Sequence, residues 1–335
     1  HVATKIAPNV EVIPTDSLIT FLYPWSAYRI AKRIFSREDA KQEKWVVSAQ
    51  DPFESGITAY AVSRQLRVPL HIQVHTDVMS PFFAAESVKN KIRQMLARFV
   101  LRRADGIRVV SKRIYRSLVQ FAKDLEKKIV VLPIFVPPEA YHRTDVENAV
   151  RNRWQHFDFI FLIASRLTRE KDIPLAIRAM GHIAQQFPRA GLLIVGDGPE
   201  KANLERIVRK RNVQESIIFV DRTEHLADYY HACDAFVITS RYEGYGRTAI
   251  ESLASGKPVI MTDVGVADWI VRDHDNGLIV PVGDEGALIA AMKSFLSDRV
   301  LRHRLHESAR EAHGGEMTKA QYNELYRASL ENLLI

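Results

Sequence analysis

Short apolar runs alternate with longer amphipathic stretches along this chain of 335 residues. In the second half the apolar runs fall at residues 157–164, 191–196, 216–220, 234–239, 257–262 and 277–280. The stretches between them have helical spacing, and strands that alternate with helices predict a parallel sheet. The pattern therefore predicts an α/β fold in this half of the chain.

The first half repeats the pattern. We expect strands at residues 10–14, 45–49, 69–75, 104–111 and 129–133, with helices at 25–35, 57–66 and 86–103. Residues 1–8 contain neither a recognisable strand nor a glycine-rich loop. A linker with two prolines and many charges follows the last of these strands, at residues 135–157. Two series of strands joined by one linker predict two domains, at residues 1–150 and 151–319.

Composition narrows the class of protein and the class of partner. With 47% hydrophobic and 26% charged residues the chain is globular rather than disordered. A formal charge of +7 and a pI near 9.4 favour an acidic partner, such as a nucleotide, an anionic lipid or a nucleic acid. Cys233 is the one cysteine, so no internal disulfide can form, and we expect a cytoplasmic protein. No apolar run approaches the ~18 residues of a membrane span.

One stretch combines features of a nucleotide-sugar site. Residues 240–258 place Glu243 and Glu251 on either side of Gly244-Tyr245-Gly246, after the apolar run at 234–239 and at the start of a helix. Loops at the carboxyl ends of strands are where open α/β sheets bind ligands. Glycines let the backbone approach a ligand closely, and a helix N-terminus attracts an anion. Carboxylates accept hydrogen bonds from hydroxyls, so an anion with hydroxyls fits this loop.

The sequence EGYGRTAIESLASGKPVI, at residues 243–260, resembles the signature of glycosyltransferase family 4. It departs from the usual pattern at Arg247-Thr248, where two apolar residues are commoner. The resemblance implies a GT-B fold, in which two Rossmann-like domains face a cleft. The N-terminal domain would here lack its usual first strand and glycine-rich loop, and a last helix at residues 320–335 would pack back on it.

The resemblance also implies roles for individual residues. Glu251 would bind the ribose hydroxyls, Glu243 the transferred sugar, and Arg166 with Lys171 the diphosphate of the donor. Taken alone, the segment from Arg166 to Lys171 is better explained as a solvated run of charges. Its place after the linker and the first strand of the second domain favours the diphosphate instead. His75, at the end of a strand in the first domain, would contact a hydroxyl of the donor sugar. Further expected contacts to the donor come from Gly244, Tyr245, Gly246 and Arg247, and from Arg222 beside the base.

The expected activity is transfer of a sugar with retention from a UDP- or GDP-sugar to a hydroxyl acceptor, a glycolipid or a growing glycan. We expect UDP rather than GDP as the nucleotide of the donor. We also expect no metal or other cofactor, because Arg166 and Lys171 would neutralise the diphosphate. No carboxylate other than Glu243 is implied near the anomeric carbon, which favours front-face substitution. The alternatives are a sugar-phosphate synthase or phosphorylase of the same fold, and a non-catalytic nucleotide-sugar- or membrane-binding module.

Residues 86–128 contain 13 Lys and Arg against 4 Asp and Glu. Within the expected helix 86–103, an apolar face of Val88, Ile92, Leu96, Phe99 and Val100 is flanked by basic side chains. Such a helix either turns its apolar face to the core or lies on an anionic membrane surface. Binding of nucleic acid is disfavoured, because no module that binds DNA or RNA is recognisable.

Overall fold

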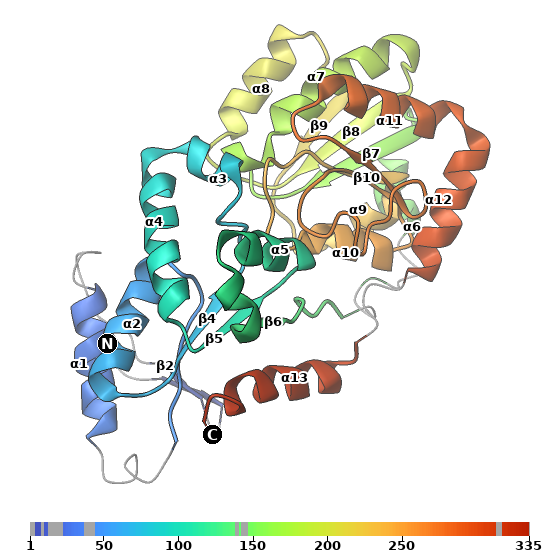
Figure 1. Cartoon of the computed structure of the whole chain (residues 1–335). Helices are drawn as coiled ribbons and strands as arrows, with labels where there is room; N and C mark the ends of the chain where they lie inside the picture. Colours follow the sequence, from blue (N-terminus) through green and yellow to red (C-terminus); the bar gives the residue numbers. More distant parts are fainter. Residues whose placement is uncertain are drawn as a thin grey trace. The chain divides into compact units, whose positions relative to one another are not determined.

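The computed structural model describes residues 4–7, 10–12, 23–36, 44–137, 141, 147–312 and 317–334. It divides into two compact units, shown in Figure 1 and treated separately below. The first unit comprises His1–Val110, Ile114–Leu132 and Asn323–Ile335, and the second comprises Ser111–Arg113 and Pro133–Tyr322. The main division falls at Pro133, whereas the sequence pattern places it after residue 150.

The first unit is built on a four-stranded parallel sheet. Its strands β3 (Val47–Ala49), β4 (Leu70–Val74), β5 (Gly106–Val109) and β6 (Ile129–Val131) lie side by side in chain order. The connecting segments form α2 (Glu54–Leu66), α3 (Pro81–Glu86), α4 (Val88–Arg103), α5 (Lys112–Phe121) and a 3-10 helix (Lys123–Lys128), and α1 (Tyr23–Phe35) packs on α2. All five side chains of β4 are buried, as expected for an inner strand covered on both faces.

The first residues differ from the expectation. Strand β1 (Thr4–Ala7) pairs antiparallel with β2 (Val10–Val12) in a separate two-stranded sheet. The expectation that residues 1–8 contain no strand is therefore wrong. Neither strand joins the parallel sheet, whose first strand in the chain is β3.

The expected helix 86–103 is divided at Ser87. Its hydroxyl accepts a hydrogen bond from the backbone N–H of Asn90 at 3.1 Å, so Ser87 caps α4 and separates it from α3. The side chains that α4 buries are Asn90, Ala97, Val100 and Leu101.

Most of the apolar face expected for this helix is therefore not buried in the core, apart from Val100. Val88, Ile92 and Phe99 are exposed by 73%, 53% and 39%, and Met95 between them is exposed by 68%. Four exposed apolar side chains at positions i, i+4, i+7 and i+11 form a stripe along one side of α4.

The last helix, α13 (Lys319–Glu331), ends in the first unit. The hydroxyl of Tyr326 accepts a hydrogen bond from Gln73 of β4 at 2.8 Å, and the guanidinium of Arg108 from β5 lies 5.1 Å from the centre of the Tyr326 ring. Arg108 is itself buried and donates to the side-chain oxygen of Gln73 at 2.7 Å. These contacts attach the end of the chain to the sheet of the first unit.

The second unit is built on a six-stranded sheet in the order β12-β11-β10-β7-β8-β9, with every neighbouring pair parallel. The strands are β7 (Phe159–Ala164), β8 (Ala190–Val195), β9 (Ile217–Val220), β10 (Ala235–Ile238), β11 (Val259–Thr262) and β12 (Gly277–Val280). The helices are α6 (Glu147–Asn152), α7 (Ile173–Gln186), α8 (Lys201–Lys210), α9 (Leu226–Ala232), α10 (Arg247–Ala254), α11 (Glu285–Ser297) and α12 (Arg299–Glu311), with a 3-10 turn at Arg169–Lys171.

This strand order creates a topological switch point. From β7 the chain moves outward through β8 to β9, then returns to the other side of β7 and moves outward again through β10, β11 and β12. Two loops therefore diverge at the carboxyl ends of the adjacent strands β7 and β10. A crevice at this position is the usual ligand site of a doubly wound sheet.

Helix α6 lies where the sequence pattern predicted only a linker. Its Arg151 donates to the carboxylate of Asp234 at 2.7 Å and to the carbonyl of Ala232 at 2.8 Å, while the same carboxylate oxygen of Asp234 accepts from the N–H of Ile160 at 2.7 Å. The helix is thus attached to the start of β7 and β10.

Candidate functional site

Two loops of the second unit bring the expected donor-binding residues together at the switch point. The loop after β7 contains Arg166 and Lys171, and the loop after β10 contains Glu243. They are held to each other by backbone and hydroxyl contacts: the N–H of Arg241 donates to the carbonyl of Glu170 at 2.8 Å, and the hydroxyl of Thr239 donates to the carbonyl of Lys171 at 2.8 Å.

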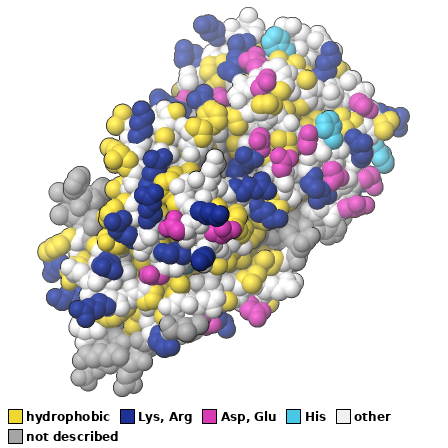
Figure 2. Space-filling model, in the orientation of Figure 1, with side chains coloured by type: hydrophobic (Ala, Val, Ile, Leu, Met, Phe, Trp, Pro, Cys, Tyr) yellow, Lys and Arg dark blue, Asp and Glu magenta, His cyan; other side chains and the backbone are white. Residues whose placement is uncertain are grey.

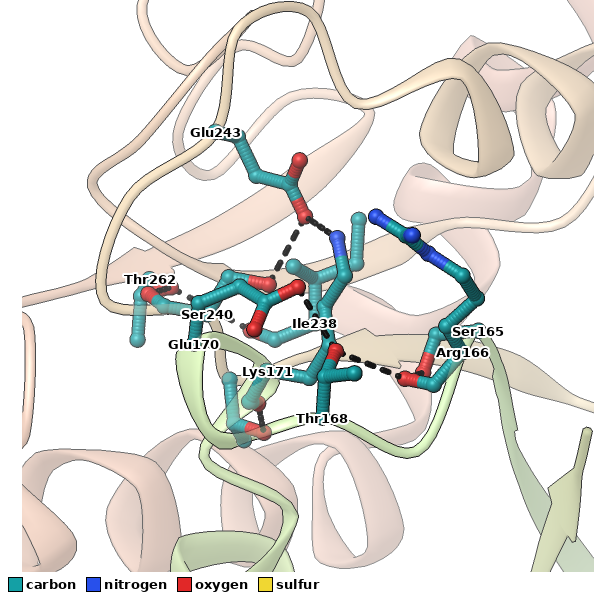
Figure 3. Close-up of polar contacts among 10 residues, drawn as sticks. Ser165, Arg166, Thr168, Glu170, Lys171, Ile238, Ser240, Glu243 and Thr262 are labelled. Carbon is teal, nitrogen blue, oxygen red and sulfur yellow. Dashed lines mark hydrogen bonds and ion pairs between the residues drawn. The ribbon is translucent and has the colours of Figure 1, made fainter. Parts of the chain in front are cut away.

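An ion pair at the centre of these loops joins Lys171 to Glu243. The distance from Lys171 Nζ to Glu243 Oε1 is 2.5 Å, and both side chains are mostly buried. The hydroxyl of Ser240 donates to the same carboxylate oxygen at 2.8 Å, as Figure 3 shows. A partly buried, hydrogen-bonded ion pair has a defined geometry, which orients both charged groups for a ligand.

Arg166 adds a second cation to the same loop. Its side chain is exposed, and Figure 3 shows its guanidinium extending to the side on which Lys171 meets Glu243. A guanidinium can bind two oxygens of a phosphate at once, whereas an ammonium acts as a point charge. The pair predicted from the sequence is therefore suited to a diphosphate.

Beyond Glu243 the chain turns sharply into α10. Gly246, the residue before this helix, has φ of 87°, a value that favours glycine. Gly265 packs against this turn, and a Cβ atom at residue 265 would lie 2.5 Å from the carbonyl oxygen of Tyr245. Only glycine fits so close to the backbone of the turn. The first N–H groups of a helix have no partner within the helix, so this turn offers donors to an anion.

Glu251 lies one turn into α10 and is 4% exposed. One carboxylate oxygen accepts from the hydroxyl of Tyr230 at 2.9 Å, and the other lies 2.7 Å from Arg247 Nε. Burial and the Glu251 carboxylate hold the pKa of the Tyr230 hydroxyl well above its usual value. Burial alone would lower the pKa of Arg247, but the Glu251 charge and Tyr141 raise it. Both groups therefore stay protonated and donate to Glu251, and Tyr141 is a third hydrogen-bond partner of this carboxylate. Three donors fix the orientation of Glu251, and a carboxylate has about four lone-pair sites, so it can still accept from a hydroxyl of a ligand.

Sequence reasoning missed the tyrosines of this cluster. Burial and Glu251 raise the pKa of Tyr141 also, and the rings of Tyr141 and Tyr230 lie 6.0 Å apart, edge to face. Tyr230 lies in α9, 21 positions before Glu251, and no motif links the two. The one available signal was an aromatic residue with a hydroxyl among the apolar positions of that helix.

The structure does not bring every expected residue to these loops. Arg222 is exposed after β9, which is separated from β7 by β8, and its contact with the base stays a prediction. His75 belongs to the first unit, where its Nε2 lies 3.2 Å from Gln50 Oε1. Burial and the charge of Arg108 lower the pKa of His75, against the opposing effect of Asp51, so its ring is neutral at pH 7. Its role toward a donor sugar also stays a prediction.

Two family models match the chain. The model described as "Glycosyl transferases group 1" matches residues 147–312, which include both loops of the switch point, and the "Glycosyl transferase 4-like domain" matches residues 7–134. Among curated proteins, N-acetyl-alpha-D-glucosaminyl L-malate synthase of Bacillus anthracis is 23% identical over 332 residues, which are 96% of this chain and 85% of that protein. Alpha-monoglucosyldiacylglycerol synthase of Streptococcus pneumoniae is 26% identical over 303 residues, 85% of this chain and 68% of that protein.

Solved structures agree on the fold. The Anabaena protein HepE in complex with UDP and glucose superposes with a TM-score of 0.78 at 18% identity, over 95% of this chain and 84% of that one. Sucrose-phosphate synthase of Thermosynechococcus elongatus superposes with a TM-score of 0.78 at 22% identity, over 98% of this chain and 86% of that one. The chain belongs to the glycosyltransferases of family 4 type and has their GT-B fold, with two Rossmann-like domains.

Proposed function

We propose that this glycosyltransferase moves a hexosyl group, with retention, from a UDP-sugar to a hydroxyl of a glycolipid or a growing glycan. The observation that carries the proposal is the pairing of Lys171 with Glu243 at the switch point, beside Arg166 and the N-terminus of α10. Cations for a diphosphate and acceptors for sugar and ribose hydroxyls lie together there. UDP is favoured over GDP because the similar structure of HepE is a complex with UDP and glucose.

Arg166 and Lys171 would act mainly on the leaving group. As the bond from the anomeric carbon to the diphosphate oxygen breaks, negative charge grows on that oxygen, and fixed cations stabilise it. The acceptor oxygen forms its bond to the same face of the anomeric carbon, and its proton passes to the departing diphosphate. Glu243 would position the sugar, and Glu251 the ribose.

We propose further that transfer needs no metal ion. The two cations beside the N-terminus of α10 would neutralise the diphosphate, which is the task that a divalent cation performs in other transferases. Within the part of the chain that the structure describes, no three His, Cys, Asp or Glu residues are grouped so that they could hold a metal ion.

The first unit would attach peripherally to an anionic membrane surface. Lys91, Arg98 and Arg102 are exposed on α4 beside the apolar stripe of Val88, Ile92, Met95 and Phe99, and Figure 2 shows basic and hydrophobic side chains intermingled over this helix. Apolar side chains that enter the lipid boundary, flanked by Lys and Arg, are the pattern of an interfacial helix. None of the helices described is both long and apolar enough to cross a bilayer.

The test of the donor site is a thermal-shift titration with UDP and with GDP, each in EDTA and in Mg²⁺. We expect UDP to raise Tm equally with and without Mg²⁺, because binding to the folded state alone stabilises it. Glu251→Gln should abolish most of the shift, and Glu215→Ala, a change at an exposed glutamate of the same unit, should retain it. No shift with either nucleotide would refute the donor site, and a shift that requires Mg²⁺ would refute metal independence.

Stereochemistry needs its own measurement. Slow hydrolysis of UDP-glucose by the protein, followed by ¹H NMR, should release α-glucose before mutarotation. Release of β-glucose as the first product would refute retention.

A further inference from the structure

A second cavity in the second unit lies away from the donor loops. Its volume is about 400 Å³, and its lining combines the residues after α10 with one side of α12. Lys257 in this lining comes just before β11 begins, whereas Glu243 follows the end of β10. Because the sheet is parallel, the cavity lies at the amino edge of the sheet and the donor loops at the carboxyl edge.

The charges that line this cavity are strongly unbalanced. Four side chains are cationic, namely Lys257, Arg299, Arg302 and Arg310, and Glu307 is the one acidic lining residue. Histidines, His303 and His306 among them, complete the polar lining. Cations that converge on one cavity give it a positive potential, which attracts an anion.

Part of this basic lining has structural contacts. Arg302 donates from Nη1 to the carbonyls of Phe295 and Leu296, at 2.8 and 3.0 Å, and Arg310 Nη1 lies 3.0 Å from Glu307 Oε1. A guanidinium has five N–H donors, and these described contacts use Nη1 alone. The Arg302 guanidinium also lies over the Phe159 ring, with Cζ 4.9 Å from the ring centre, which leaves Arg310 and the exposed Arg299 as the arginines better placed to donate to a ligand.

His306 lies in this lining, and its pKa responds mainly to burial and then to the charges around it. Burial, the charge of Lys257 and the charge of Arg310 lower its pKa, although the carbonyl of Gly256 and the charge of Asp234 oppose them. An anion beside His306 would favour the imidazolium and raise this pKa again. The histidine is therefore a local reporter of ligand binding.

We propose that this cavity binds a soluble small molecule that carries a phosphate monoester or a diphosphate, independently of the donor. The volume is within the range of small-molecule sites, and the lining offers several arginine forks, the donor type suited to phosphate. Helix α10 joins the two sites, since Arg247 and Glu251 stand toward the donor loops and the residues after Ala254 line the cavity.

The test follows ¹³C-labelled histidine resonances by NMR while inorganic pyrophosphate is added at constant ionic strength. His303→Asn and His306→Asn assign the two reporter signals. We expect saturable shifts of both signals and a raised pKa of His306. Arg299→Ala combined with Arg310→Ala should weaken binding at least about tenfold, the effect of losing one hydrogen bond to a charged group. The matched control is Arg304→Ala, an exposed arginine of α12 outside the cavity, and we expect it to change affinity less than about twofold.

Three results would overturn the proposal. Unchanged signals at millimolar pyrophosphate would show that the cavity binds no phosphate, and an equal loss in Arg304→Ala would show unspecific attraction. Shifts caused by phosphatidylglycerol vesicles but not by pyrophosphate would show a lipid headgroup rather than a soluble ligand. Lys171→Ala should leave this titration unchanged even if it abolishes UDP binding, so the two sites are tested separately.

Discussion

At the scale of the residue, the hydroxyl of Tyr230 determines how Glu251 is held. Tyr230 is fully buried and Glu251 nearly so, and their 2.9 Å hydrogen bond satisfies a carboxylate inside the unit. Tyr230→Phe should lower the free energy of unfolding of the second unit by about 2 kcal/mol, since a buried charged acceptor loses a donor. Urea denaturation measures this loss. Tyr229→Phe, in the same helix, is the control, and equal losses in the two variants would contradict a specific role for the Tyr230 hydroxyl.

His71 makes the stability of the first unit depend on pH. Burial, followed by the charge of Arg108, lowers its pKa from 6.5 to about 4, and its Nδ1 lies 3.0 Å from the hydroxyl of Ser48. The unfolded chain therefore binds a proton at a higher pH than the folded chain. The contribution to stability is complete above pH 6.5 and is lost as the pH falls toward 4.

As the pH falls from 6.5 to 4, the lowered pKa of His71 should reduce the free energy of unfolding of the first unit by up to about 3 kcal/mol. His71→Gln should flatten the fall of Tm between these pH values, whereas His225→Gln, at an exposed position, should leave its slope unchanged. Equal slopes in the wild type and in His71→Gln would refute the assignment to His71.

At the scale of the element, α4 shows why a helical pattern alone does not identify the buried face. Asn90 is buried on α4 while Val88, Ile92 and Met95 are exposed, so the polarity of the side chains misleads at four positions of one helix. Hydrophobic periodicity predicts a core face because apolar burial usually dominates folding. It does not identify the buried face of α4, and it also could not place the break at Ser87, which depends on one side-chain hydrogen bond.

The proposed membrane attachment predicts which side chains of α4 would contact lipid. Ile92→Ser combined with Met95→Ser should weaken binding to phosphatidylglycerol vesicles about tenfold, because two apolar side chains no longer enter the bilayer boundary. Tm should change little, since both positions are exposed. Vesicle sedimentation measures the affinity. Val300→Ser, at an equally exposed valine of α12, is the control, and unchanged sedimentation of the α4 variant would exclude this stripe as the docking surface.

At the scale of the whole molecule, most of the sheet strands and the loops of the donor site could be predicted from the sequence. Buried parallel strands are continuous apolar runs, and the Glu243–Glu251 signature marks the second loop directly. Residues joined only by tertiary contacts could not be predicted, because no local pattern records them. Tyr230 beside Glu251, Arg151 beside Asp234, and the basic cavity lined from α12 are of this kind.

Helix α13 belongs to both units, because it begins in the second and ends in the first. A change at its end therefore tests whether the two units unfold separately. Tyr326→Ala removes the ring that covers the buried Arg108 and the hydroxyl that Gln73 contacts. The free energy of unfolding of the first unit should fall by about 3 kcal/mol, as for other aromatic side chains replaced by alanine. Amide hydrogen exchange should therefore accelerate in β4 and β5 but not in β7 and β8, because each sheet has its own core. Leu325→Ala, at an exposed position of the same helix, should alter neither. Faster exchange in both sheets would instead show that the two units open as one cooperative body.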